Sequence, residues 1–328
     1  MIDNLAKNCI ENGGDIIPLI IPSDLTNGTG ITNPSLLIDK DKILLNIRHV
    51  GYSLYLCENN QRFQTKWGPD YAPFCYLHPE DDCTLRTINY LCELDEENYD
   101  IINYKKVDTS KLDVKPVWEF IGLEDARLVN WDNKVFMCGV RRDTKTNGEG
   151  RMELSEVKDG VEVNRTRIEP PNDPNSYCEK NWMPILDKPF HFIKWSNPTE
   201  VVKVNLNNKN SKTIKISPKF DGVRRDIRGG SQVIKIDDYY VAITHEVDLW
   251  NNENGKKDGR YYHRFVVWDN NFEIVKVSDD FNFMSAGVEF CCGLALHKDN
   301  ILMTFGYQDN ASFLLKAPLS YIKKFLGI

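Results

Sequence analysis

Short apolar runs separated by polar turns recur along the whole chain, and this pattern predicts β-hairpins. From Gly122 the sequence reads GLEDARLVNWDNKVFMCGVRRD, in which two apolar runs flank an Asp132-Asn133 turn. Two antiparallel strands joined by a tight turn produce such a pattern. Comparable units open near residues 33, 180, 228 and 290, and each continues into a further apolar segment. We therefore expect an all-β fold.

The spacing of the units indicates their arrangement. Their starts at Asn33, Asp125, Asn181, Gly230 and Gly293 are separated, by subtraction, by 92, 56, 49 and 63 residues. Blades of three or four strands joined by uneven loops have such spacings, so the sequence predicts a five-bladed β-propeller. We expect one domain over residues 1–328, with blades that open near 33, 124, 180, 228 and 290.

Two segments read as short helices, Asn4–Asn12 and Leu319–Leu326, and they lie at the two ends of the chain. In the first unit, the segment Tyr52–Cys57 is expected to supply the third strand of the blade. No other stretch has a clear helical period.

The composition limits the kinds of partner that the protein is expected to bind. The 328 residues are 41% hydrophobic and 11% aromatic, enough for a large core. A net charge of −7 argues against a nucleic-acid partner. No apolar run is long enough to span a membrane, and the run Ile16–Ile21 is interrupted by Pro18 and lacks the preceding basic region of a secretory signal.

The nine cysteines have no metal-binding spacing and include one adjacent pair, Cys291-Cys292. Such scattered cysteines are typical of buried thiols in a reducing compartment, so we expect a cytoplasmic protein with no cofactor and no metal. The sequence leaves the oligomeric state open.

Charged residues stand where the units open. In a propeller the first strand of each blade lies nearest the central axis, so these residues should converge on one pocket. The candidates are Asn33, Arg48, Glu124, Asp125, Arg127, Lys180, Asn181, Arg228 and Asp309. Alternation along a strand places Asp125 and Arg127 on one face and Glu124 on the other, so only one of the two carboxylates is expected to face the pocket.

Carboxylates beside arginine, asparagine and aromatic side chains suit a sugar. Transfer of a glycosyl unit needs an acid for the departing oxygen and a nucleophile on the opposite face of the ring. A water nucleophile requires a second carboxylate, whereas phosphate requires cations. The cations near unit openings are Arg48, Arg141, Arg142, Lys180, Arg228, His245, His263 and Arg264.

The segments GLEDAR, NPSLL, NIRHVGY and FGYQDNASFLL resemble the five-bladed family of β-mannoside phosphorylases and related β-1,2-mannosyltransferases. The resemblance runs from about Asn33 to Lys316, with Ala126 in place of the usual proline. It implies Asp125 as the proton donor, Arg127 as a sugar ligand and Asp309 as a ligand of sugar hydroxyls. Together with the residues at the unit openings, this gives substrate-binding candidates Asn33, Arg48, Tyr52, Arg127, Asn181, Trp182, Glu289 and Asp309, and phosphate-binding candidates Lys180, Arg228, His245, Tyr262 and His263.

The implied activity is inverting transfer of a mannosyl or similar unit between phosphate, or a phosphate-bearing donor, and a carbohydrate. The alternatives are an inverting mannoside hydrolase, with Asp309, Glu289 or Glu246 as the second carboxylate, and a glycan-binding propeller without catalysis. One feature of the motif opposes direct acid catalysis: Arg127 on the same strand face should lower the pKa of Asp125. Either Arg127 turns to the substrate, or Asp125 acts through a relay.

Each candidate also has a purely structural interpretation. Asp125 and Arg127 could form a salt bridge between blades, Asp309 could be a turn residue, and Glu289 a structural acceptor, which we favour. Arg141 and Arg142 are expected to solvate a loop. The pairs Gly229-Gly230 and Cys291-Cys292 are expected to be turn and core residues, respectively.

Overall fold

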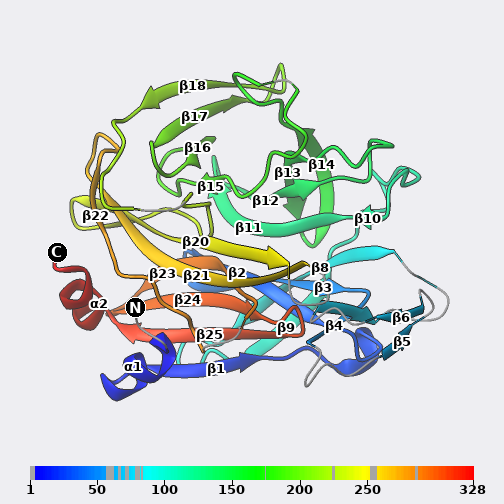
Figure 1. Ribbon diagram of the computed structural model, residues 1–328, viewed down its shortest axis with the longest axis horizontal. Helices are drawn as coiled ribbons and strands as arrows, with labels where there is room; N and C mark the ends of the chain where they lie inside the picture. The colour runs from blue at the N-terminus through cyan, green and yellow to red at the C-terminus, as the bar shows by residue number, and fades with distance from the viewer. Residues whose placement is uncertain are drawn as a thin grey trace.

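Five β-sheets surround a common centre in the computed structural model of the chain (Figure 1). The structure describes residues 4–56, 63–65, 68–70, 74–77, 82, 84–173, 175–223, 226–251, 257–284 and 287–328. The fold is a five-bladed β-propeller, which confirms the architecture that the hairpin pattern predicts.

Each blade is one antiparallel sheet, whose strands follow one another from the innermost outwards. The first contains β2 (Ile31–Asp39), β3 (Lys42–Val50), β8 (Leu85–Leu94) and β9 (Ile101–Lys106), with β10 (Phe120–Ile121) parallel to β8. The second contains β11 (Leu123–Trp131), β12 (Lys134–Arg141), β13 (Arg151–Lys158) and β14 (Val161–Arg167). The third contains β15 (Met183–Pro184), β16 (His191–Trp195), β17 (Glu200–Asn205) and β18 (Asn210–Ile216). The fourth contains β19 (Ile234–Ile236), β20 (Tyr239–Asn251), β21 (Lys257–Trp268) and β22 (Ile274–Val277).

The fifth blade is built from both ends of the chain. It contains β23 (Glu289–His297), β24 (Asn300–Tyr307), β25 (Ala311–Pro318) and, outermost, β1 (Asp15–Leu19). Strand β1 pairs antiparallel with β25, from Asp15 opposite Lys316 to Leu19 opposite Ser312. The inner strands lie beside one another, since β2 contacts both β11 and β23. The ring is therefore closed by hydrogen bonds between the first and last strands.

The two predicted helices are confirmed as α1 (Leu5–Glu11) and α2 (Leu319–Leu326). The side chain of Asn4 accepts a hydrogen bond from the Lys7 amide and caps α1. Gly327, with φ of 65°, ends α2 in the left-handed conformation that glycine adopts without strain. A single 3₁₀ turn, η1 (Ser23–Leu25), completes the helices of the described residues, none of which is of a length and apolarity to cross a bilayer.

The third strand of the first blade differs from the prediction. Strand β4 (Ser53–Leu56) pairs with β7 (Phe74–Leu77) in a separate ribbon, and β5 (Phe63–Thr65) pairs with β6 (Gly68–Asp70). The blade instead takes β8 beside β3. The expectation for Tyr52–Cys57 was therefore wrong, because a long insertion separates the second and third strands; Cys57 itself lies outside the described residues.

Three inner strands are irregular where they approach the centre. Asn33, Asp125 and Asn181 adopt φ of 46°, 50° and 61°, and the strand registers shift at the first two of these positions. Asparagine and aspartate tolerate this left-handed conformation better than other residues with a side chain. A bulge inserts an extra residue and turns its side chain to a new direction. The alternation of faces therefore breaks at the points where the blades open.

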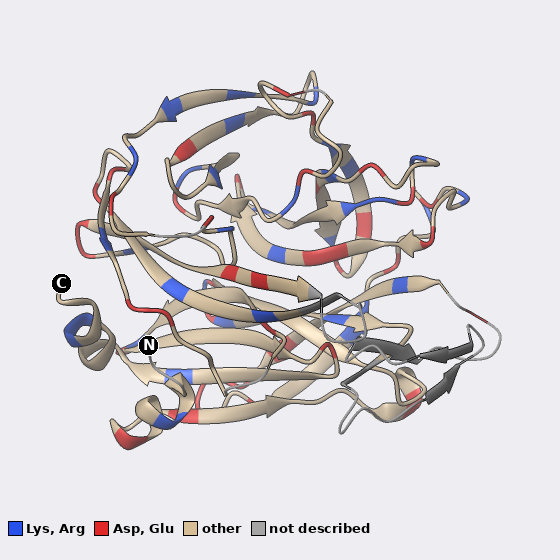
Figure 2. Cartoon of the chain, in the orientation of Figure 1, with Lys and Arg blue, Asp and Glu red and all other residues tan. Residues whose placement is uncertain are grey.

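The core lies between neighbouring blades. Trp131 and Phe136 of the second blade pack against Phe192 and Val202 of the third, and similar apolar layers separate the other blades. Charged residues of both signs are interspersed on the strands and loops around these layers (Figure 2). The buried layers fix the blades relative to one another and so position the polar residues at the centre.

Candidate active site

A buried arginine joins two neighbouring carboxylates at the opening of β11. Arg48 of β3 places Nη1 2.9 Å from Oδ1 of Asp125 and Nη2 3.5 Å from Oε2 of Glu124. The expectation that only one of these carboxylates could face the pocket was wrong. The bulge at Asp125 removes the strict alternation on which it rested, so both acids reach the same guanidinium.

Asp125 is held by donors from the first blade. The amide Nδ2 of Asn33 donates to Oδ1 of Asp125 at 2.7 Å, beside the contact from Arg48. Burial opposes ionisation of Asp125, but the charges of Arg48 and Arg127 and the hydrogen bond from Asn33 outweigh it and lower the pKa of this carboxyl. Asp125 is therefore a carboxylate at neutral pH in the free protein.

Glu124 has the opposite electrostatic environment. Burial raises the pKa of Glu124, although the nearby Arg48 partly offsets the effect. Its Oε1 atom is buried and has no hydrogen-bond partner among the described residues. Two adjacent carboxyls with pKa values displaced in opposite directions are an arrangement that can separate proton donor from anion.

Asp309 joins the same group from the fifth blade. It lies in the three-residue β24–β25 turn, where Gln308 and Asp309 have φ of 53° and 50°, in the left-handed region that tight hairpin turns use. The hydroxyl of Tyr52 donates to Oδ2 of Asp309 at 3.2 Å, and Thr32 Oγ1 lies 3.4 Å from Oδ1. Asp309 is thus both a turn residue and a member of the central cluster.

Thr32 connects Asp309 to Asp125, and nothing in the sequence singled it out. Its hydroxyl also donates to Oδ1 of Asn33 at 2.8 Å, and Asn33 in turn donates to Asp125. Burial raises the pKa of Asp309, so its protonated form is favoured relative to an exposed aspartate. A continuous chain of polar groups therefore links an acid with a raised pKa to one with a lowered pKa.

Arg127 does not have the predicted role. Its guanidinium donates to the main-chain oxygens of Gly230 at 2.8 Å and Asp125 at 2.7 Å, and to Oδ1 of Asn181 at 3.4 Å. With 1% of its surface exposed, it has no face open to a sugar, which contradicts the expected ligand contact. It does not form the alternative salt bridge either, because it binds the carbonyl of Asp125. Arg127 instead ties the second blade to the third and fourth.

Three predicted phosphate ligands lie together. Lys180 and Arg228 are exposed, and both positive charges contribute to the environment of His245. Burial, His263 and these cations hold the pKa of His245 well below its usual range. Its Nδ1 lies 2.9 Å from the Gly229 oxygen, so the neutral ring donates there and Nε2 is the acceptor. The charge of Lys180 also acts on Asp125 and Glu124, which places Lys180 near the carboxylates, whereas Arg228 acts on His245.

The two remaining phosphate candidates are on β21, next to the strand that carries His245. His263 lies opposite His245 on the neighbouring strand, is fully buried between Phe281 and Phe283, and has its pKa lowered to about 3 by burial, so its ring is neutral and not exposed to solvent. Tyr262 lies on the opposite strand face from His245, whereas Tyr261 stacks on that ring at 5.8 Å. Tyr262 therefore does not share a strand face with His245, although both residues were predicted to bind phosphate.

Trp182 and Glu289 also have structural roles in place of the predicted substrate contacts. Trp182 packs on Phe192 in the core with 1% exposure, and its Nε1 donates to Glu179 at 3.0 Å. Glu289 accepts the main-chain N–H groups of Phe283 and Met284, each at 2.6 Å, as the favoured structural interpretation predicted. Aromatic and acidic residues near a blade opening are therefore not all directed to the centre.

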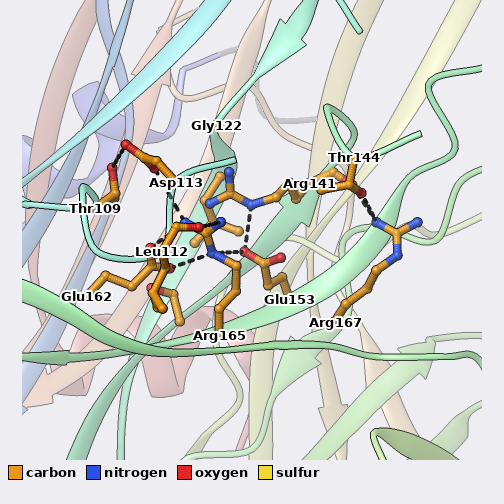
Figure 3. A network of polar contacts seen from close by, with 12 residues as sticks. Thr109, Leu112, Asp113, Gly122, Arg141, Thr144, Glu153, Glu162, Arg165 and Arg167 are labelled. Atoms are coloured by element: carbon orange, nitrogen blue, oxygen red, sulfur yellow. Dashed lines mark hydrogen bonds and ion pairs between the residues drawn. The ribbon is translucent and has the colours of Figure 1, made fainter. Parts of the chain in front are cut away.

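Arg141 belongs to a buried ion network and does not solvate a loop. It contacts Glu153 at 2.7 Å and Asp143 at 3.3 Å, while Arg165 contacts Glu153 at 3.5 Å and Glu162 at 2.5 Å (Figure 3). Arg165 also donates to the main-chain oxygen of Leu112 at 3.0 Å. The network borders a cavity of about 350 Å³ between the first and second blades. It fastens the connection after β9 to the second blade.

The two neighbouring pairs singled out in the sequence are packed into the fold. A Cβ on Gly229 would lie 1.9 Å from the Asn181 oxygen, and one on Gly230 would lie 2.4 Å from the Ile243 oxygen. These glycines allow close backbone packing. Cys291 and Cys292 are both buried, and burial raises the pKa of each thiol above its usual range.

The geometry can be set beside known proteins. No protein-family model and no curated protein sequence matches this sequence. Among solved structures, the β-1,2-mannobiose phosphorylase of Listeria innocua in complex with β-1,2-mannobiose has a TM-score of 0.55 at 14% identity, over 95% of this chain and 96% of that one. A glycosyl hydrolase of Bacteroides ovatus has a TM-score of 0.52 at 12% identity, over 88% and 84% of the two chains.

A third structure comes from a study of glycoside hydrolases of the GH130 family of mannoside phosphorylases that target β-1,2 mannosidic linkages in Candida mannan. It has a TM-score of 0.51 at 13% identity, over 88% of this chain and 84% of that one. The likeness to all three extends over most of each chain. The chain therefore shares the fold of these solved carbohydrate-active proteins.

Proposed function

We propose that the protein is an inverting, mannoside-active enzyme that moves a mannosyl or similar unit between phosphate, or a phosphate-bearing donor, and a carbohydrate. The observation that supports this most directly is the position of Asp125. Its carboxylate is anchored by Asn33 and Arg48 and lies beside Lys180, in the same region as Arg228 and His245. The shared fold of the Listeria innocua phosphorylase, solved with β-1,2-mannobiose, supports the same sugar class.

In the phosphorolytic direction, a phosphate oxygen forms the new bond at the anomeric carbon while the glycosidic bond breaks. The departing oxygen takes up a proton, for which Asp125 is the proposed donor. Because Asp125 is ionised in the free protein, it must be protonated when substrate is bound. A sugar that displaces water from the carboxylate raises its pKa, so Asp125 takes up a proton from solvent as substrate binds and gives it to the departing oxygen, directly or through a sugar hydroxyl.

The choice of phosphate over water follows from the surrounding charges. A hydrolase needs a second carboxylate as base, and two of the three candidates are engaged: Glu246 by Arg264, and Glu289 by two main-chain N–H groups. The exposed Lys180 and Arg228 instead suit an incoming phosphate, since cationic groups offset its charge during transfer. We therefore favour phosphorolysis or transfer over hydrolysis.

The test is to incubate the protein with β-1,2-mannobiose and inorganic phosphate and, in reverse, with mannose 1-phosphate or GDP-mannose and mannose, with products identified by mass spectrometry. We expect mannose 1-phosphate in the first reaction, and a loss of about 10²- to 10⁴-fold in rate for Asp125→Asn. Asp41→Asn, in the exposed β2–β3 turn, is the matched control. Free mannose as sole product, independent of phosphate, would show a hydrolase; a wild-type rate for Asp125→Asn would rule out the assigned acid.

A further inference from the structure

The connection that leads into the third blade presents an unusually well-fixed aromatic ring to solvent. Tyr177 is 53% exposed, yet its hydroxyl donates to the Asn147 oxygen at 3.0 Å and accepts from Nη2 of Arg142 at 3.0 Å. The Arg142 guanidinium also lies over the Tyr177 ring, 5.6 Å from its centroid. An exposed tyrosine is normally free to change rotamer, but this one is held at its hydroxyl and at one face.

Arg142 is itself fixed from its other side. Its guanidinium lies 4.5 Å from the centroid of Phe120, and its Nε donates to the Gly148 oxygen at 2.9 Å. The β12–β13 loop, strand β10 and the connection after β14 therefore hold one arginine between two rings, and the expectation that Arg142 solvates a loop was wrong. We call the solvent-facing side of the Tyr177 ring, backed by Arg142, the stacking platform.

The stacking platform lies close to the central cluster. Tyr177 is three residues before Lys180, so the two Cα atoms are at most about 11 Å apart. The main-chain oxygen of Tyr177 accepts a hydrogen bond from the main-chain N–H of Gly150 at 3.0 Å. The main-chain N–H of Glu179 donates to the main-chain oxygen of Gly150, also at 3.0 Å. These two bonds fix this segment to the residue that precedes β13. Arg142 is also among the charges that act on Glu124. The Tyr177 segment is thus fixed next to Lys180, and the arginine behind its ring acts on a residue of the central cluster.

The chemistry of the platform favours a sugar ring. The aromatic face is apolar, and two N–H groups of Arg142, at Nε and Nη2, are already used within the protein. The apolar face of a pyranose stacks on such a ring, whereas a phosphate needs hydrogen-bond donors, which the face of a tyrosine ring does not offer. The exposed Glu119, next to Phe120, also opposes an anionic ligand.

Resting on the proposed function, we propose that the Tyr177 ring binds a sugar unit of the substrate beyond the two units joined at the scissile bond. The protein then acts preferentially on oligosaccharides of three or more units. Arg142 is a positioning residue in this arrangement, because it fixes the ring without touching the sugar.

The test compares wild type, Tyr177→Ala and Tyr177→Phe on β-mannooligosaccharides of two to five units with inorganic phosphate. We expect Tyr177→Ala to lower kcat/KM for the longer substrates by about three- to tenfold and to leave the disaccharide unchanged, while Tyr177→Phe keeps most of the activity. Tyr104→Ala, at a 42% exposed tyrosine on the outer strand β9, is the matched control. Equal losses at every chain length, or the same loss in the control, would overturn the proposal.

Titration calorimetry with the tetrasaccharide, without phosphate, separates this proposal from the proposed function. If the wild-type protein turns over no mannoside, the proposed function fails. The role of the Tyr177 ring is then still tested by binding: Tyr177→Ala should weaken tetrasaccharide binding by a similar factor. Unchanged tetrasaccharide binding overturns it. Weakened binding of GDP with unchanged binding of the tetrasaccharide would also overturn it and identify the ring as a base-stacking surface.

Discussion

The amide of Asn33 and the carboxylate of Asp125 meet at 2.7 Å across the boundary between the first and second blades. Both residues adopt left-handed backbone conformations, with φ of 46° and 50°. The same irregularity thus recurs on two neighbouring inner strands and turns two polar side chains towards each other. The position of the proposed acid therefore depends on a contact with the neighbouring blade, from a residue 92 positions earlier in the sequence.

Replacement of Asn33 separates the contact from the backbone conformation. Asn33→Ala and Asn33→Gly both remove a hydrogen bond to a charged group, so both should lower kcat by about tenfold to a hundredfold. Only the alanine must adopt a left-handed φ at a cost, so its unfolding free energy should be lower than that of the glycine variant by about 1 kcal/mol. Urea denaturation and initial rates measure the two effects. Full activity in both variants would show that Asn33 does not position Asp125.

The raised pKa of Glu124 has a definite effect on stability. Between the pKa of the unfolded chain and that of the folded protein, the folded protein holds the proton more tightly, so stability falls as pH rises through this window. Glu124→Gln has no such proton to lose. Its unfolding free energy relative to wild type should therefore increase between about pH 4 and the folded pKa, as followed by urea denaturation at several pH values. A difference that does not vary with pH would contradict a raised pKa.

Lys180 and Arg228 should contribute to the binding of phosphate more than to the binding of the sugar. Lys180→Ala or Arg228→Ala should raise the KM for phosphate by about tenfold, as loss of one charge-assisted contact implies, with a smaller change in the KM for the sugar. Lys212→Ala, at an exposed lysine on the outer strand β18, serves as the control. Equal rises in both KM values would indicate a general effect on the site and would oppose a phosphate contact.

Removal of one partner from the ion network of Figure 3 should destabilise the protein, because it leaves buried charges without their partner. Arg141→Ala leaves Glu153 and Asp143 without one of their partners, so the unfolding free energy should fall by about 3–5 kcal/mol. Lys42→Ala, which breaks an exposed pair with Glu93, should cost about 1 kcal/mol or less. Similar losses in urea denaturation of the two variants would mean that burial of the network has little effect.

Much of the fold was predictable because hairpins are local. The turn at Asp132-Asn133 and the apolar runs on each side specify β11 and β12 without any distant contact, and the same holds for β24 and β25. The third strand of the first blade was not predictable in this way, since β8 reaches β3 only after a long insertion. Strand β1 was also missed, because its partner β25 lies at the other end of the chain.

The candidate site was predicted less completely. The sequence placed Asp125, Arg48, Asn33 and Asp309 at blade openings, and the structure brings them together. Burial is a property of the packed chain, so the sequence did not distinguish Trp182 from a ligand-facing aromatic residue. The alternation argument failed at Glu124 because of the bulge. Asparagine or aspartate at the openings was an available signal, since these residues favour left-handed positions.

Closure of the fifth blade has a consequence for the order in which the molecule is made. Thr32 and Asp309 are 277 residues apart and meet only when the final hairpin docks beside the first blade. During synthesis from the N-terminus, β1 waits without its partner until β25 has left the ribosome. A nascent chain that lacks its last two strands can therefore form several blades while the central polar cluster is still missing one wall.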